Sequence, residues 1–175
     1  FWKADHPFRV KRSLLLTWDD VKNNNIVMLG SPAENFLLRE LPQTQDFVFK
    51  VVGQDSAGPV YGIVNLKPQP GEQEIYVVKE DGPSSYQVTE DYALVTLLKG
   101  LDDRHRLMIL AGIKTYGTQA ATEYVTRAVT FKKLFNHLRP SGNSPFPAYY
   151  QVLLKVKIND GVPVQTSYVT HHVLD

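Results

Sequence analysis

Groups able to bind an anion are concentrated in Gly112-Ile-Lys-Thr-Tyr-Gly-Thr118, which follows the apolar run from Leu107 to Ala111. A continuous apolar run is typical of a strand covered on both faces, and glycine lets the chain turn sharply after it. A strand, a turn and a helix start in this order would direct unpaired N–H groups and the positive end of a helix dipole at one point. The stretch therefore predicts a site for an anion or for a ligand that carries a carbonyl group.

A second corner of the same form lies earlier in the chain. Ile26 to Leu29 is typical of a strand, Gly30 follows it, and Ser31-Pro-Ala-Glu34 has the form of a capping box at a helix start. Ligands of open α/β sheets bind beyond the carboxyl ends of neighbouring strands, so both corners would lie at one edge if the two strands are parallel. Glycine and serine are also needed merely to turn the chain and cap the helix, and that alternative stays open. The candidate ligand-binding residues are Ser31, Asn35, Lys114, Thr115, Tyr116, Gly117 and Thr118.

Glu34 is the candidate catalytic residue. A carboxylate at this edge could act as general acid or base in the cleavage of a nucleoside's glycosidic bond, although the capping box explains Glu34 without catalysis. Glu90 or Asp91 could supply a second carboxylate, but the sequence does not place either near Glu34. The motifs of serine hydrolases, P-loop proteins and dinucleotide-binding proteins do not occur.

Composition excludes several other kinds of site. The chain has no cysteine, and the adjacent His171 and His172 would point to opposite faces of a strand, so we expect neither a metal site nor a cofactor. The formal net charge is +1 and no basic stripe occurs, which argues against nucleic-acid binding. No apolar run approaches the roughly 20 residues that span a bilayer, so we expect no direct membrane insertion. The lack of cysteine slightly favours a cytoplasmic location.

The elements around these sites alternate between strand and helix patterns. We predict a short helical turn at 17–23, and the linker between the strands at 92–98 and 107–111 is too short for a parallel crossover, which requires a mixed sheet. The predicted fold class is α/β, a three-layer Rossmann-like fold with a mixed sheet, an inserted β-hairpin at 60–79 and a C-terminal β-hairpin. The other predicted strands are 26–29, 47–52, 150–158 and 162–173, and the main helices are 31–41, 118–128 and 130–138.

The length of 175 residues predicts a single domain over 1–175. Residues 1–25 form an irregular lead-in, and the start at Phe1-Trp2-Lys3, without an initiator methionine, suggests a piece of a longer chain.

Three strings give the chain a resemblance to a known pattern. They are Asn25-Ile-Val-Met-Leu-Gly-Ser-Pro-Ala-Glu-Asn35, Asp91-Tyr-Ala-Leu-Val95 and Leu110-Ala-Gly-Ile-Lys-Thr-Tyr-Gly-Thr-Gln-Ala-Ala121. Together they resemble an uncharacterised bacterial domain family over about residues 20 to 130. The resemblance implies a domain at the C-terminal end of longer regulatory or membrane-attached chains. A more distant similarity, at the level of fold, is to Rossmann-like domains that sense or cleave nucleotides and nucleosides.

Three functions follow as hypotheses. The first is a bacterial signalling domain that senses or binds a nucleotide-like or other anionic small molecule through the two corners. The second is an enzyme that hydrolyses a nucleoside or nucleotide glycosidic bond with Glu34. The third is a protein-interaction or homo-oligomerisation domain, because a terminal hairpin offers unpaired backbone groups to another copy.

Overall fold

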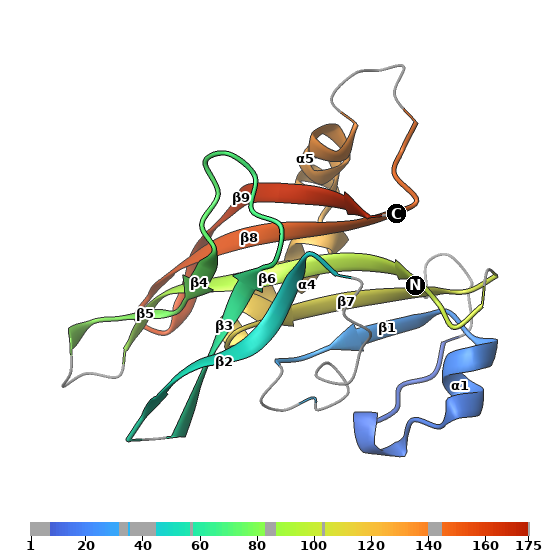
Figure 1. Ribbon diagram of the computed structural model, residues 1–175, viewed down its shortest axis with the longest axis horizontal. Helices are drawn as coiled ribbons and strands as arrows, with labels where there is room; N and C mark the ends of the chain where they lie inside the picture. The colour runs from blue at the N-terminus through green and yellow to red at the C-terminus, as the bar shows by residue number, and fades with distance from the viewer. Residues whose placement is uncertain are drawn as a thin grey trace.

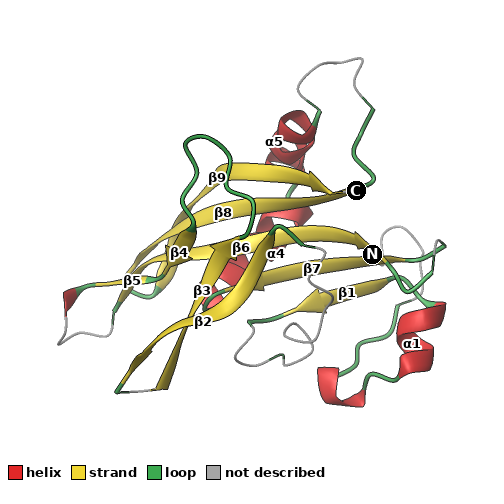
Figure 2. Cartoon of the chain, in the orientation of Figure 1, coloured by secondary structure: helices red, strands yellow, loops and turns green. Residues whose placement is uncertain are grey.

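The computed structural model describes residues 8–31, 35, 45–56, 58–82, 87–102, 104–139 and 145–174. Within these ranges the chain is mainly β. A large mixed sheet forms the centre of the molecule, with helices against one face and a smaller sheet against the other (Figures 1 and 2).

The large sheet has the strand order β1-β7-β6-β8-β9, with β5 paired to β6. β1 and β7 are parallel, and the other neighbouring pairs are antiparallel. The predicted mixed sheet is therefore confirmed, as is the antiparallel pairing of the strands at 92–98 and 107–111. The strand bounds are β1 Ile26–Leu29, β5 Lys79–Glu80, β6 Val88–Lys99, β7 Arg106–Gly112, β8 Tyr149–Asn159 and β9 Val162–Leu174.

Helices α4 (Thr115–Thr126) and α5 (Ala128–Leu138) cover one face of the large sheet. Both present an apolar stripe to it: Tyr124, Leu134 and Leu138 are buried against the β6 and β8 side chains Val95 and Val152. The two helices were predicted, but α4 begins three residues earlier than the pattern indicated.

The other face of the large sheet is covered by a second sheet of β2 (Phe47–Asp55), β3 (Gly58–Asn65) and β4 (Ile75–Val77), in antiparallel order. Phe47 and Ile63 from this sheet are fully buried and pack against Leu94 and Leu153 of the large sheet. Burial of such a side chain stabilises the fold by about 1.5–3 kcal/mol.

The predicted Rossmann-like fold class is therefore wrong. The predicted hairpin at 60–79 does form, as β3 and β4, but it joins β2 to make a layer of its own. A Rossmann-like fold needs helical crossovers between parallel strands to cover both faces of its sheet. Among the described strands β1 and β7 are the one parallel pair, so the second face is covered by strands instead of helices.

The terminal parts of the chain follow the local signals. The C-terminal hairpin turns at Asp160 and Gly161, both with positive φ, as a two-residue hairpin loop requires. The predicted turn at 17–23 is α1 (Trp18–Asn23), with a capping box between Thr17 and Asp20, and a 3-10 turn, η2 (Ser13–Leu15), precedes it.

The helix predicted at 31–41 falls outside the described residues except for Ser31 and Asn35. In the parts of the chain that are described, no helix is long and apolar enough to cross a membrane.

Candidate functional site

The two predicted corners do lie at one edge of the sheet. β1 and β7 are parallel, with Leu29 opposite Leu110, so both strands run out toward the same side. The Gly30 N–H donates to the Leu110 carbonyl at 3.3 Å, and the φ of +138° at Gly30 is one that other residues rarely adopt. Ser31 and Asn35, which follow, are both buried, and the Asn35 N–H donates to the Ser31 carbonyl at 2.8 Å.

The amides at the start of α4 are occupied by a carboxylate of the protein itself. Asp91, near the start of β6, is fully buried, and its Oδ2 accepts a hydrogen bond from the Gly117 N–H at 2.6 Å. The Lys114 N–H lies 3.2 and 3.3 Å from the two carboxylate oxygens, and the Tyr92 N–H donates to Oδ1 at 2.8 Å. Asp91 therefore acts as the cap of α4 from a neighbouring strand and holds the position predicted for an anionic ligand.

Burial raises the pKa of Asp91 to about 6, and the hydrogen bonds from the Gly117, Tyr92 and Lys114 amides offset only part of that effect. The folded state therefore binds the proton more tightly than the unfolded state, whose pKa is near 3.8. The free energy of unfolding should fall by roughly 3 kcal/mol, from this group alone, as the pH rises from about 4 to about 6. In Asp91→Asn, the free energy of unfolding should not show this fall over the same pH range, as measured by urea denaturation at each pH. The same pH dependence of the unfolding free energy in the variant and the wild type would contradict this prediction.

Gly112 and Gly117 are needed for close packing, and neither has positive φ. A Cβ at Gly117 would lie 2.8 Å from Asp91 Oδ2 and 2.8 Å from the Tyr92 carbonyl oxygen, and a Cβ at Gly112 would lie 2.4 Å from the Thr118 nitrogen. The Thr118 hydroxyl in turn accepts a hydrogen bond from the Gly112 N–H at 2.9 Å. The glycines predicted to shape a binding turn thus bring α4 against β6 and β7.

The other residues of the second corner differ in their surroundings. The side chains of Lys114 and Thr115 are exposed. Tyr116 packs against Val156 and Ile158 at the far end of β8. The link between the first corner and β7 is thus the bond from Gly30 to Leu110, just before Ser31. Gly117 and Thr118 take part in internal hydrogen bonds, and Tyr116 packs in the core.

At this edge, one buried polar atom lacks a partner within the described part of the chain. Asn35 is 6% exposed, and its buried side-chain Oδ1 has no hydrogen-bond partner among the residues that the structure describes. An unpaired buried acceptor costs about 1–3 kcal/mol, so a retained one calls for an explanation. Asn35 Oδ1 is therefore the atom at the predicted edge best suited to receive a hydrogen bond from a ligand.

The carboxylates considered for catalysis are otherwise engaged or not described. Glu34 lies outside the described residues. Glu90 forms ion pairs with Lys79 at 2.9 Å and Lys155 at 2.8 Å, and Asp91 caps α4. Both candidates for a second carboxylate thus have structural partners.

A buried polar network that the sequence did not reveal joins the two sheets. His172 on β9 is 2% exposed, and its Nδ1 lies 3.0 Å from Asp46 Oδ2 while its Nε2 lies 3.0 Å from Glu72 Oε2. The imidazole ring therefore lies between two buried carboxyl groups and contacts each of them through one of its nitrogens. Gln151 adds to the network, because its Oε1 accepts from the Asp46 and Phe47 amides at 2.9 and 2.8 Å.

Glu72 is the member of this network whose ionisation is most strongly shifted. Burial alone would raise its pKa, but hydrogen bonds from the Gln69 amide, Thr170, Asn65 and His172 outweigh burial and lower the pKa to about 2. The Thr170 hydroxyl donates to Oε1 at 2.5 Å. The carboxylate is therefore held in its charged form as one side of the network.

The two adjacent histidines point to opposite faces, as strand alternation predicts. His172 faces Asp46 and Glu72, whereas His171 Nδ1 lies 2.6 Å from the Tyr168 hydroxyl on the helix side of β9. Tyr168 also stacks on His137 of α5, with ring centroids 3.8 Å apart. Over the described residues, no group of three His, Cys, Asp or Glu side chains could hold a metal ion.

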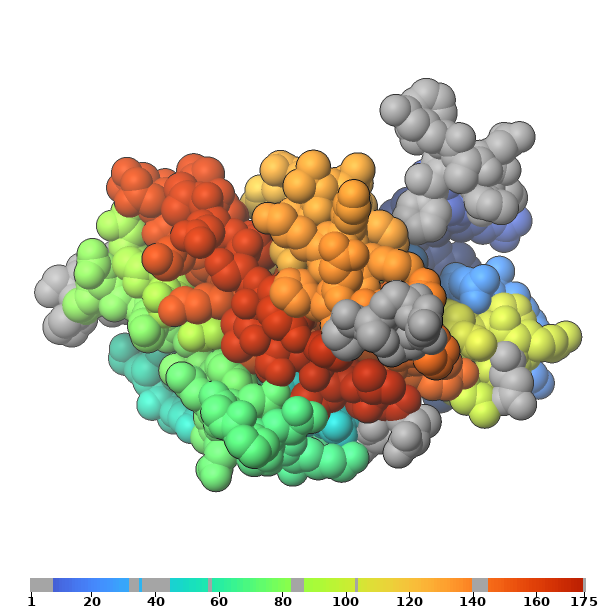
Figure 3. Space-filling model, turned by 90° about the horizontal axis from the view of Figure 1, so that it is seen from above, coloured from blue at the N-terminus to red at the C-terminus, as the bar shows by residue number. Residues whose placement is uncertain are grey.

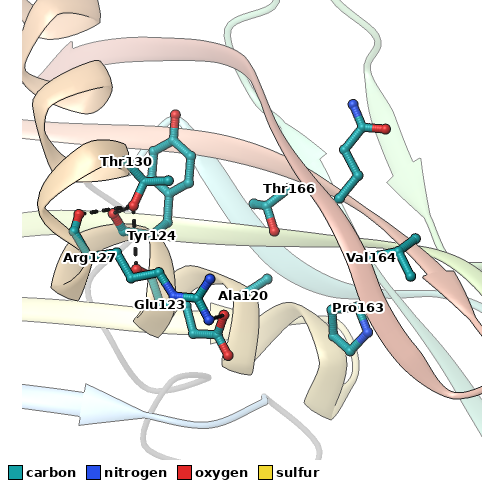
Figure 4. Close-up of a pocket in the computed structure, with 9 residues that line it drawn as sticks. Ala120, Glu123, Tyr124, Arg127, Thr130, Pro163, Val164 and Thr166 are labelled. Carbon is teal, nitrogen blue, oxygen red and sulfur yellow. Dashed lines mark hydrogen bonds and ion pairs between the residues drawn. The ribbon is translucent and has the colours of Figure 1, made fainter.

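A separate pocket of about 160 Å³ opens between the helices and the start of β9 (Figure 4). The Arg127 guanidinium is paired to Glu123 at 2.7 Å, and the Thr130 hydroxyl donates to the Tyr124 carbonyl at 2.7 Å, so these polar groups of the pocket already have partners. None of the predicted site residues lines this pocket, whose walls are Ala120, Glu123, Tyr124, Arg127, Thr130, Pro163, Val164, Gln165 and Thr166.

The terminal hairpin places β9 at the edge of the large sheet, where its residues reach the surface beside α5 (Figure 3). Its 13 residues carry no acidic or basic side chain other than histidine. The strand nevertheless has register shifts opposite Leu153/Leu154 and Lys157/Ile158, and a proline at position 163. Bulges and proline are devices that resist edge pairing, so these features disfavour an interface in which β9 pairs with another copy.

Comparison of the chain with family models, with curated proteins and with solved structures found no match.

Proposed function

We propose that this domain binds a small polar molecule at the carboxyl edge of β1 and β7, with Asn35 as the main contact. The observation that carries the proposal is the buried Oδ1 of Asn35, for which the described residues supply no hydrogen-bond partner, next to the buried Ser31. A ligand N–H or O–H that reaches this oxygen would recover the free energy that its burial costs.

The charge at this edge favours a neutral group over an anion. The buried Asp91 already fills the amides at the start of α4, and its own charge would oppose a phosphate placed at the same helix end. The ligand contact at Asn35 is therefore a hydroxyl, amine or amide, such as the base or ribose of a nucleoside-like molecule, with any phosphate directed away from Asp91. In a bacterial regulatory chain of the kind that the sequence resembles, such binding would be a sensing step.

A thermal-shift screen with nucleosides and their 5′-phosphates tests the proposal. A true ligand at a hundred times its dissociation constant should stabilise the protein by about 2.7 kcal/mol. Asn35→Leu should abolish that shift, whereas the unliganded variant should unfold near the wild-type temperature, because an apolar side chain of similar size leaves no acceptor unpaired.

Gln165→Ala, in the pocket beside α4, is the matched control and should keep the full shift. A ligand-induced thermal shift of wild-type size in Asn35→Leu would contradict the proposal. Analysis of the same incubations for free base would show whether hydrolysis, the alternative built on Glu34, takes place.

A further inference from the structure

The N-terminal arm, residues 8–23, displays large apolar side chains that the domain does not cover. Val10 is 87% exposed, Trp18 80%, Leu14 75% and Leu15 65%. Figure 1 shows this segment and α1 at one end of the molecule, beyond β1. Single exposed apolar side chains are ordinary, but four within nine residues, here called the apolar patch, indicate a binding surface.

The arm is ordered by its own contacts. Thr17 and Asp20 form the capping box of α1, and the Lys11 ammonium lies 2.7 Å from both carboxylate oxygens of Asp20. The Lys11 ammonium and the Thr17 groups lower the pKa of Asp20, so the carboxylate stays charged and the link persists. The Arg106 N–H donates to Asn25 Oδ1 at 2.9 Å just after the arm. These contacts fix the conformation of the arm in which the apolar side chains are exposed to solvent.

The charge of the arm decides what it would bind. Arg9, Lys11 and Arg12 lie within four residues, and no acidic residue occurs between positions 8 and 18. Arg9 and Arg12 are exposed, next to the exposed Val10 and Leu14. A protein surface that covered the patch would have to be both apolar and acidic. An anionic lipid surface supplies both properties at once, because its headgroups attract Lys and Arg while its interface accepts Trp and Leu.

We propose that the N-terminal arm is a peripheral docking surface for an anionic lipid bilayer. Arg9 and Arg12 bind the headgroups, and Leu14, Leu15 and Trp18 enter the interface without spanning it. The surface is separate from the edge that holds Asn35, so it does not depend on ligand binding.

Co-sedimentation with lipid vesicles tests this docking surface. The chain should bind phosphatidylcholine vesicles that contain phosphatidylglycerol and should bind pure phosphatidylcholine much more weakly. Because each cation near an anionic surface contributes about 1 kcal/mol, Arg9→Gln and Arg12→Gln should each weaken binding roughly fivefold. Leu14→Ser combined with Trp18→Ser should also reduce binding, with an unchanged unfolding temperature, since both side chains are exposed.

The matched control is Lys132→Gln with Lys133→Gln, which removes an exposed basic pair from α5 and should leave binding unchanged. Equal losses in the control and the arginine variants would overturn the proposal, because the attraction would then come from overall charge. Absence of vesicle binding would overturn it too. If sedimentation equilibrium then showed self-association that Leu14→Ser and Trp18→Ser abolish, the arm would be an interface between copies.

Discussion

Gly112→Ala is expected to destabilise the protein by about 3 kcal/mol or more, as measured by urea denaturation. The added Cβ would lie 2.4 Å from the Thr118 nitrogen, 2.5 Å from the Gly117 Cα and 2.6 Å from the Gly117 carbonyl carbon. All three are backbone atoms, so no side chain can move aside. The start of α4 would have to shift away from β7, which would also loosen the hydrogen bonds between Asp91 and the α4 amides.

Gly53→Ala on β2 is the matched control. It adds the same methyl group at a strand glycine, and its nearest contact there would be the Val60 Cβ at an ordinary 3.8 Å. The control should change the free energy of unfolding by less than about 0.5 kcal/mol. Similar stability of the two variants would show that the tight contact between β7 and α4 is not a requirement of the fold.

His172→Ala should destabilise the protein by about 3 kcal/mol, because it removes a buried ring that contacts two buried carboxyl groups and leaves a cavity in its place. Asp46 and Glu72 would then lie on either side of a cavity beside Phe47, whose ring centroid is 4.5 Å from that of the imidazole, and Asp46 would keep its ion pair with Lys67 at 2.8 Å. His105→Ala is a suitable control, since His105 pairs with Asp102 nearer the surface, where such pairs contribute at most about 1 kcal/mol. Equal losses of unfolding free energy in the two variants would show that His172 does not stabilise the contact between the two sheets.

The acid response of the same network has a definite sign. Glu72 has its pKa lowered from 4.5 to about 2, so its contribution to stability is present above pH 4.5 and is lost as the pH falls toward 2. This trend is opposite to the one expected from Asp91, which destabilises the fold as the pH rises toward 6. Glu72→Gln should reduce the loss of unfolding free energy that occurs below pH 4.5. It should leave the decrease due to Asp91, between about pH 4 and 6, unchanged.

Local sequence patterns predicted most of the helices and strands. They did not predict how these elements combine into layers. The alternation at 150–158 and the Asn159-Asp160-Gly161 turn specify a hairpin from sequence alone. The choice between a helix and a sheet as the second covering layer depends on β2 pairing with β3, which the strand patterns leave open. A strand with one buried face gives the same alternation whatever covers it.

The candidate site shows the same limit at the level of single residues. The sequence left the relative direction of β1 and β7 open, and the structure pairs them in parallel, with Leu29 opposite Leu110. Asp91 was considered as a catalytic carboxylate, because a sequence cannot show that a residue on another strand reaches the α4 amides. His172 was missed for the same reason, since Asp46 and Glu72 lie 126 and 100 residues away in the chain.

The most direct test of the proposed ligand edge is an amide NMR titration of the isotopically labelled protein with a nucleoside that stabilises it. The largest shift changes should fall on the side-chain amide of Asn35 and on the backbone amides of Gly30, Ser31 and Leu110, whereas the Asp91-bound amides of Lys114 and Gly117 should change little. Changes centred on Gly117 with Asn35 unaffected, or confined to Thr166 and Gln165, would contradict a ligand site at the end of β1 and β7.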